Sequence, residues 1–154
     1  MDLVTTAPRV AVHGETPIAR AVLAVGRALG YDTVPFEVDA LEGAAAVVLA
    51  CHGGPGEDAA LQAALDSGVA YIGLVARRAR GEAVVARLAL EAAVAARIHT
   101  PAGLDIGART PEEVALAILA EIVASRPRLP GQSRAARGKT PCNHGEPTLP
   151  AAPA

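Results

Sequence analysis

Aromatic side chains are nearly absent from this 154-residue sequence, which has two tyrosines, one phenylalanine and no tryptophan. Hydrophobic residues nevertheless make up 51% of the chain, so a core must be built from alanine, valine, leucine and isoleucine. The length fits one domain that can bury such a core. A small aliphatic core of this kind suits closely packed helices and strands.

Cysteine, excess charge and long apolar runs are also scarce. The two cysteines, Cys51 and Cys142, form no metal-ligand or redox spacing, which argues against a disulfide framework. A net charge of -2 gives no reason to expect a nucleic acid or an anionic membrane as partner. The longest apolar run, around 44–51, is too short to cross a bilayer, and the N-terminus does not resemble a signal peptide. We therefore expect a cytoplasmic protein.

Short apolar runs alternate with helical patterns along the chain. Strands are expected at 9–13, 33–38, 45–51 and 69–75, with a short strand or extended link at 98–104. Helices are expected at 17–29, 57–67, 81–97 and 111–124. This alternation predicts an α/β fold, a three-layer Rossmann-like domain with a mostly parallel sheet. Pro35 cannot donate to a ladder, so the second strand should be irregular or lie near an edge.

The helix from residue 111 has the clearest signals. Thr110 stands at the N-cap position, Pro111 at the first helical position, and Glu113 completes a capping box. Two apolar rows are expected to face the core, with Glu121 outward. These rows are Val114, Ile118 and Ile122, and Ala115, Leu119 and Val123.

The loop before this helix carries one acid, Asp105, between Gly103 and Gly107, and one base, Arg109, after them. Free N–H groups at a helix N-terminus attract anions, so the loop could help to bind one. The alternative is a tight turn held by an ion pair between Asp105 and Arg109.

Further candidates follow the predicted strands, where ligands bind in open α/β sheets. Gly14 follows the first strand, and Asp39, about 25 residues later, stands near the position of an acid that holds a ribose hydroxyl. A solvent-facing loop is the alternative for Asp39. His52 begins a glycine-rich loop after the third strand. Three arginines follow the fourth strand, and guanidinium groups suit phosphate. They are Arg77, Arg78 and Arg80.

Composition changes after residue 125. The segment 126–154 is rich in proline, glycine, arginine and alanine and has no apolar period, so we expect it to be disordered. The folded domain is expected to comprise residues 1–125.

The string GLDIGARTPEE at 103–113, with Tyr71-Ile72-Gly73-Leu74 upstream, closely resembles the C-terminal domain of the XdhC/CoxI family. The similarity runs over roughly residues 9–125. It implies a non-catalytic maturation factor for molybdenum hydroxylases such as xanthine dehydrogenase or carbon monoxide dehydrogenase. Such a factor binds the molybdenum cofactor (molybdopterin) transiently and passes it to the apoenzyme. The implied crevice contains Gly14, His52, Arg78, Asp105 and Arg109, with Asp39 as a further cofactor-binding candidate, and no catalytic or metal-ligating residue.

The sequence also departs from the family pattern. The family's Gly-Ala-Gly-His-Val-Ala corresponds here to Gly14-Glu15-Thr16-Pro17-Ile18-Ala19. Because Thr16 replaces the second glycine, NAD(P) binding is disfavoured. The family's Thr-His step becomes Cys51-His52; the thiol could relay sulfur, or it could be a buried structural group.

The family's N-terminal domain has no counterpart in this sequence. A separate XdhC N-terminal-domain protein or a cysteine desulfurase could therefore act as partner, beside the molybdenum hydroxylase apoenzyme. A surface rich in alanine and valine could support a homodimer. The alternative functions are an NAD(P)-dependent oxidoreductase and a degenerate scaffold module of a split factor.

Overall fold

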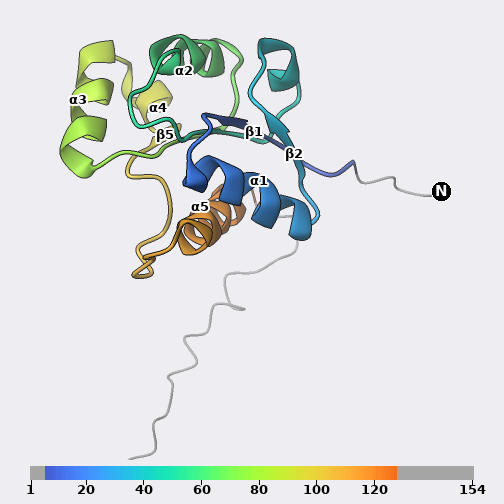
Figure 1. Cartoon of the computed structure of the whole chain (residues 1–154). Helices are drawn as coiled ribbons and strands as arrows, with labels where there is room; N and C mark the ends of the chain where they lie inside the picture. Colours follow the sequence, from blue (N-terminus) through green and yellow to red (C-terminus); the bar gives the residue numbers. More distant parts are fainter. Residues whose placement is uncertain (1–5, 128–154) are drawn as a thin grey trace, which may run out of the picture.

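A five-stranded sheet lies at the centre of the computed structural model, which describes residues 6–127 (Figure 1). All strand pairs are parallel, in the order β2-β1-β3-β4-β5. The strands are β1 (Arg9–His13), β2 (Asp32–Pro35), β3 (Ala46–Leu49), β4 (Tyr71–Leu74) and β5 (Ile98–His99). The predicted α/β fold with a parallel sheet is confirmed. The disorder predicted for the C-terminal segment concerns mainly residues 128–154, which lie outside the described part.

Helices cover both faces of the sheet (Figure 1). On one face lie α1 (Pro17–Ala28) and α5 (Pro111–Ser125), which pack against each other. On the other lie α2 (Glu57–Asp66), α3 (Arg78–Leu88), α4 (Ala92–Ala95) and the 3-10 helix η1 (Val38–Leu41). The result is the predicted three-layer arrangement.

The central strand β3 explains why the sheet needs two helical layers. All four of its residues are fully buried. Ala46 and Val48 pack into the core beneath α1 and α5, whereas Val47 and Leu49 pack into the core beneath α2 and α3. Successive side chains of a strand point to opposite faces, so a continuous apolar run is buried on both.

Helix α5 begins as the sequence predicts. Thr110 accepts a hydrogen bond from the main chain of Glu113, and the Glu113 carboxylate accepts one from the main chain of Thr110. Two side chains differ from the prediction. Val123 is 53% exposed, and Glu121 is half-buried rather than outward because it accepts a hydrogen bond from Tyr71 Oη at 2.7 Å.

Three element boundaries were predicted wrongly. The second strand ends at Pro35 on the sheet edge, and Val38 begins η1 instead of extending the strand. Leu29, the last residue of the helix expected at 17–29, is the exposed C-cap of α1. The single helix expected at 81–97 is divided into α3 and α4, because Ala89 adopts a left-handed conformation (φ 47°) and Leu90 turns into the core.

Candidate functional site

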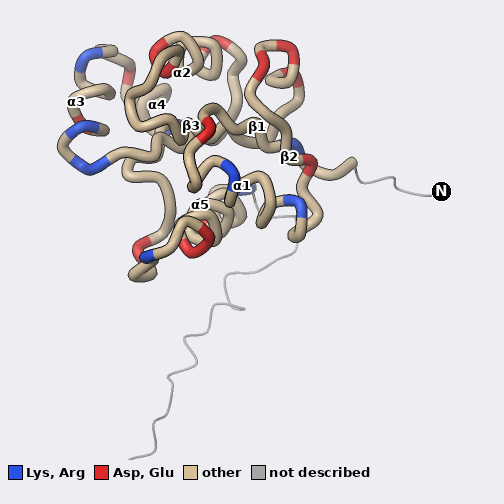
Figure 2. The backbone as a smooth tube through the Cα atoms, in the orientation of Figure 1, with Lys and Arg blue, Asp and Glu red and all other residues tan. Residues whose placement is uncertain are grey.

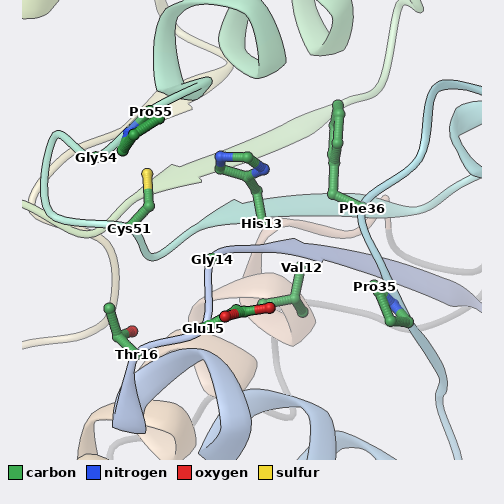
Figure 3. Close-up of a pocket in the computed structure, with 10 residues that line it drawn as sticks. All are labelled: Val12, His13, Gly14, Glu15, Thr16, Pro35, Phe36, Cys51, Gly54 and Pro55. Carbon is green, nitrogen blue, oxygen red and sulfur yellow. The ribbon is translucent and has the colours of Figure 1, made fainter.

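The strand order creates a topological switch point between β1 and β3. The chain leaves β1 toward α1 on one face and leaves β3 toward α2 on the other, so a crevice opens above the carboxyl ends of these two strands. A pocket of about 520 Å³ lies there (Figure 3). It is lined by Val12, His13, Gly14, Glu15, Thr16, Pro35, Phe36, Cys51, Gly54 and Pro55.

The turn after β1 has no room for a side chain at Gly14 and is held by the side chain of Thr16. Gly14 has φ 113°, and a Cβ atom there would lie 2.5 Å from the carbonyl oxygen of Ala50. Thr16 Oγ1 donates to that same oxygen at 2.6 Å and accepts from the main chain of Ala19, which caps α1. In a dinucleotide fingerprint the second glycine leaves this space free for the pyrophosphate. Thr16 stands at the second-glycine position here, and the disfavoured binding of NAD(P) stays a prediction.

An aromatic pair and a thiol form another part of the pocket wall. The rings of His13 and Phe36 meet edge to face, with centroids 5.5 Å apart. In Figure 3 the His13 ring lies between Cys51 and Phe36, and the Glu15 carboxylate lies below them, on the side of α1. The pocket therefore offers flat apolar surface together with one carboxylate.

A buried carboxylate anchors the loop that follows β3. Glu57, 5% exposed at the start of α2, accepts hydrogen bonds from Cys51 Sγ at 3.2 Å and from the main chain of Gly53 at 2.9 Å. Arg80 approaches it with both terminal nitrogens, at 2.6 and 3.2 Å. Burial acts to raise the pKa of the Glu57 carboxyl, but the hydrogen bonds from Arg80, Cys51 and Gly53 outweigh it and hold the pKa below its usual value.

This network changes the interpretation of two residues. Arg80, expected among free phosphate-binding arginines, is committed to Glu57. Burial, the hydrogen bond to Glu57 and the charge of Glu57 raise the pKa of the Cys51 thiol to about 11, so the thiol is protonated at neutral pH. Since the thiolate is the reactive form, Cys51 is poorly suited to relay sulfur.

We expect Cys51 to react slowly with iodoacetamide at neutral pH, and its alkylation rate to rise only as the pH approaches about 11. Measurements need a Cys142→Ser background, so that Cys51 is the only thiol. Glu57→Gln should move the midpoint of the rate profile to lower pH, because it removes the negative charge beside the thiol. Asp58→Asn is the matched control, because Asp58 pairs with Arg87. An equal shift in both variants would contradict this account.

Two further hollows follow the switch-point pocket along this edge of the sheet. One, of about 490 Å³, is lined by His52, Arg77 and residues that include Ile18, Pro101 and Val114. The next, of about 420 Å³, shares Pro101 and Val114 with it and adds Arg78 and Asp105. His52 has a positive φ of 52°, which is strained for a residue other than glycine and recurs at functional sites.

The start of α3 lies at these hollows and differs from the other long helices. α1 and α5 are capped by Thr16 and Thr110, and α2 has Glu57 and Asp58 in its first turn. α3 begins with Arg77 as N-cap, without a side-chain cap or an acid in its first turn. Its first N–H groups, with two guanidinium groups, form a positive region (Figure 2). Within the described range, no carboxylate lies within 4.0 Å of Arg77, and Arg78 reaches only the exposed Glu82 at 4.0 Å.

The predicted site residues are distributed along this edge of the sheet rather than around one cavity. Gly14 lines the switch-point pocket, His52 the second hollow, and Arg78 and Asp105 the third. Arg109 lines none of these three, and Asp39 is exposed in η1, away from the switch-point pocket. The roles of all six as cofactor ligands stay predictions.

The loop before α5 is held differently from the ion-pair alternative. In the described part of the chain no ion pair joins Asp105 and Arg109. Glu121 Oε1 instead accepts from the main chain of Gly103 at 3.1 Å and from Tyr71, whose ring stacks on His99. Burial and then this hydrogen bond raise the pKa of the Tyr71 hydroxyl. Glu121 thus ties the loop to strand β4.

Residues 6–127 contain neither a metal-binding cluster nor a helix that could span a membrane. No group of three or more histidine, cysteine, aspartate or glutamate side chains is arranged to hold a metal ion. No helix has both the length and the hydrophobicity needed to span a membrane.

Two known proteins illustrate what the chain is similar to. The chain is 38% identical over 76 residues to the uncharacterized protein YqeB of Escherichia coli (strain K12), a match that covers 47% of this chain and 14% of YqeB. It is also similar in fold to a Bacillus halodurans crystal structure titled as a xanthine dehydrogenase, with a TM-score of 0.63 and 19% identity. That match covers 83% of this chain and 45% of the Bacillus chain, so this chain spans less than half the length of either protein.

The family comparison is broader. The model of the XdhC Rossmann domain matches residues 10–122, which include β1 except its first residue, the other four strands and most of α5. The family predicted from the string at 103–113 is confirmed, and the chain belongs to the XdhC Rossmann-domain family.

Proposed function

We propose that this protein is a non-catalytic accessory factor for a molybdenum hydroxylase, which assists binding of the molybdenum cofactor and its insertion into the apoenzyme. The observation that carries the proposal is the positive region formed by Arg77, Arg78 and the uncapped start of α3. Guanidinium groups and free helical N–H groups both bind phosphate. The pterin of the molybdenum cofactor carries a terminal phosphate. Membership of the XdhC family supports the direction of this proposal.

The chemistry of the site suits holding a ligand better than making bonds. The Cys51 thiol is protonated at neutral pH, and the Glu57 carboxylate that faces it is committed to Arg80. The remaining polar groups at the edge, such as His52 and Arg77, are placed to bind an anion. Transient binding and release, rather than catalysis, are then the task of this chain.

The proposed partners are the apoenzyme and a second maturation protein. The match to the Bacillus halodurans structure covers 45% of that chain. We propose a separate XdhC N-terminal-domain protein, or a cysteine desulfurase that supplies the sulfido ligand, as the second protein. We propose that the factor acts in the cytoplasm.

The test is an anaerobic titration of the full chain with molybdenum cofactor, with NAD and NADP in parallel. We expect the wild type to bind the cofactor in the micromolar range or tighter. Arg77→Ala/Arg78→Ala should weaken binding by at least roughly a hundredfold, since hydrogen bonds to charged groups contribute about 1.5–3 kcal/mol each and two guanidinium groups are removed.

The control variant is Arg27→Ala, which removes an exposed arginine in the last turn of α1, at the opposite end from the crevice. Binding of NAD or NADP alone would support the oxidoreductase alternative. Binding of none of the three ligands would favour the scaffold alternative and would direct attention to protein partners.

A further inference from the structure

The crevice along the sheet edge has two ends of opposite charge. The switch-point pocket and the second hollow meet at the Cys51-His52 step, because Cys51 lines the first and His52 the second. Helix α1 also contributes to both, through its N-cap Thr16 and through Ile18. Arg77 belongs to the second hollow, whereas the switch-point pocket has a carboxylate, Glu15, and no lysine or arginine among its ten lining residues.

The Glu15 carboxylate is free to bind a ligand. No hydrogen bond or ion pair found among residues 6–127 involves its side-chain oxygens; only its main-chain carbonyl is used, by Arg20 Nη1 at 2.7 Å. The residue is exposed, yet it lines a pocket of about 520 Å³. An ionised carboxylate accepts hydrogen bonds at two oxygens and donates none. A group with two adjacent N–H donors complements these two oxygens.

The other walls of this pocket favour a flat heterocycle. Phe36 and His13 present ring surfaces, and the thiol of Cys51 is protonated and uncharged at neutral pH. Pyrophosphate would meet the negative charge of Glu15 and the side chain of Thr16. The pocket therefore disfavours an anion at the position where a dinucleotide would place one, although the neighbouring hollow favours an anion.

We propose that Glu15 binds the 2-amino-pyrimidinone edge of the cofactor's pterin, while the pterin phosphate lies at Arg77 and Arg78. This proposal rests on the proposed function. That edge carries two neighbouring N–H donors, which match the two oxygens of one carboxylate. The charge separation of the crevice then sets the direction in which the ligand lies. Glu15 thereby selects for a pterin over a nicotinamide dinucleotide.

The test compares ligands that contain the pterin ring, the phosphate group or both. Neopterin, neopterin monophosphate, inorganic phosphate and molybdenum cofactor are titrated into the full chain at pH 7, with pterin fluorescence and calorimetry as readouts. Glu15→Gln keeps the shape of the side chain but replaces one acceptor oxygen with a donor group. We expect it to weaken binding of both neopterin forms and of the cofactor about tenfold and to leave phosphate binding unchanged.

Arg77→Ala/Arg78→Ala should show the opposite selectivity, with loss of phosphate binding and little change for neopterin. Glu91→Gln is the matched control, because Glu91 is exposed at the N-cap of α4 and its side chain makes no capping hydrogen bond. Guanine shares the 2-amino-pyrimidinone edge, so GMP is titrated as well. Glu15-dependent binding of GMP in place of the neopterins would overturn the assignment to a pterin.

The two proposals fail in different ways. If the wild type binds molybdenum cofactor but Glu15→Gln binds it equally well, the role of Glu15 is wrong and the proposed function stands. If neopterin binding depends on Glu15 but the cofactor does not bind, the proposed function is wrong and the pterin pocket stands. If the wild type binds neither the neopterins nor the cofactor, both are overturned.

Discussion

Gly81→Ala is expected to lower the free energy of unfolding by about 2 kcal/mol, although alanine is the better helix former by up to about 1 kcal/mol. Gly81 lies in the first turn of α3 and is buried. A Cβ atom there would overlap Thr100 Oγ1 and lie 3.0 Å from both Thr100 Cβ and Cγ2. The chain after β5 therefore packs directly on the helix that carries the positive region. Urea unfolding followed by circular dichroism measures the effect.

A double-mutant cycle with Thr100→Ala separates this overlap from other causes. Thr100 Oγ1 is buried and has no hydrogen-bond partner within the described residues, so its removal should change the stability by less than about 1 kcal/mol. In the double variant the overlap is reduced to the Cβ contact, and we expect a coupling energy of at least about 1 kcal/mol. Additive effects of the two substitutions would show that the overlap does not determine the cost.

The sequence predicts the fold well where the signal is local. The capping box of Thr110 and Glu113 involves residues three apart, and the apolar run before Cys51 needs only its own composition to indicate a buried strand. Pro35 correctly indicates an edge, because a missing N–H is a property of the residue itself. Such features are independent of which elements become neighbours.

The errors and omissions come from contacts between distant residues. Glu57 resembles an ordinary acid at a helix start, and only its 23-residue separation from Arg80, closed by the fold, makes it the anchor of the loop after β3. Glu121 sits on the face expected to be polar, but Tyr71, 50 residues away, brings it inward. No glycine or proline marks the break between α3 and α4. Leu90 and Val94, at and after the break, pack against the core.

The candidate site shows the same division. Strand ends predict that Gly14, His52 and Arg78 lie along one edge of the sheet, because the carboxyl ends of parallel strands meet there. The side-chain partners could not be predicted. Arg80, expected among the phosphate-binding arginines, forms an ion pair with Glu57 instead. Arg77, which the sequence does not distinguish from its neighbours, lines the same hollow as His52.

Gly14→Ala is expected to have the largest effect of any single substitution considered, about 3 kcal/mol or more, because neither the backbone angle nor the space tolerates a Cβ atom. Its φ of 113° lies in a region that side chains rarely adopt. The atoms that a Cβ would meet are main-chain atoms at the end of β3, at 2.5 Å from the Ala50 oxygen and 2.8 Å from the Ala50 carbon. A main chain buried in the centre of the sheet cannot move aside as a flexible side chain can.

Gly107→Ala is the matched control for backbone strain alone. Gly107 also has a positive φ, 73°, but nothing lies within 4 Å of its Cβ position, so we expect a cost of about 1 kcal/mol. The difference between the two variants, measured by urea unfolding, then gives the cost of the contact with Ala50. A similar cost for both would mean that Gly14 serves only its turn. A large difference would mean that this glycine lets the start of α1 pack against the end of β3, so that the first glycine of the fingerprint is needed for the fold itself.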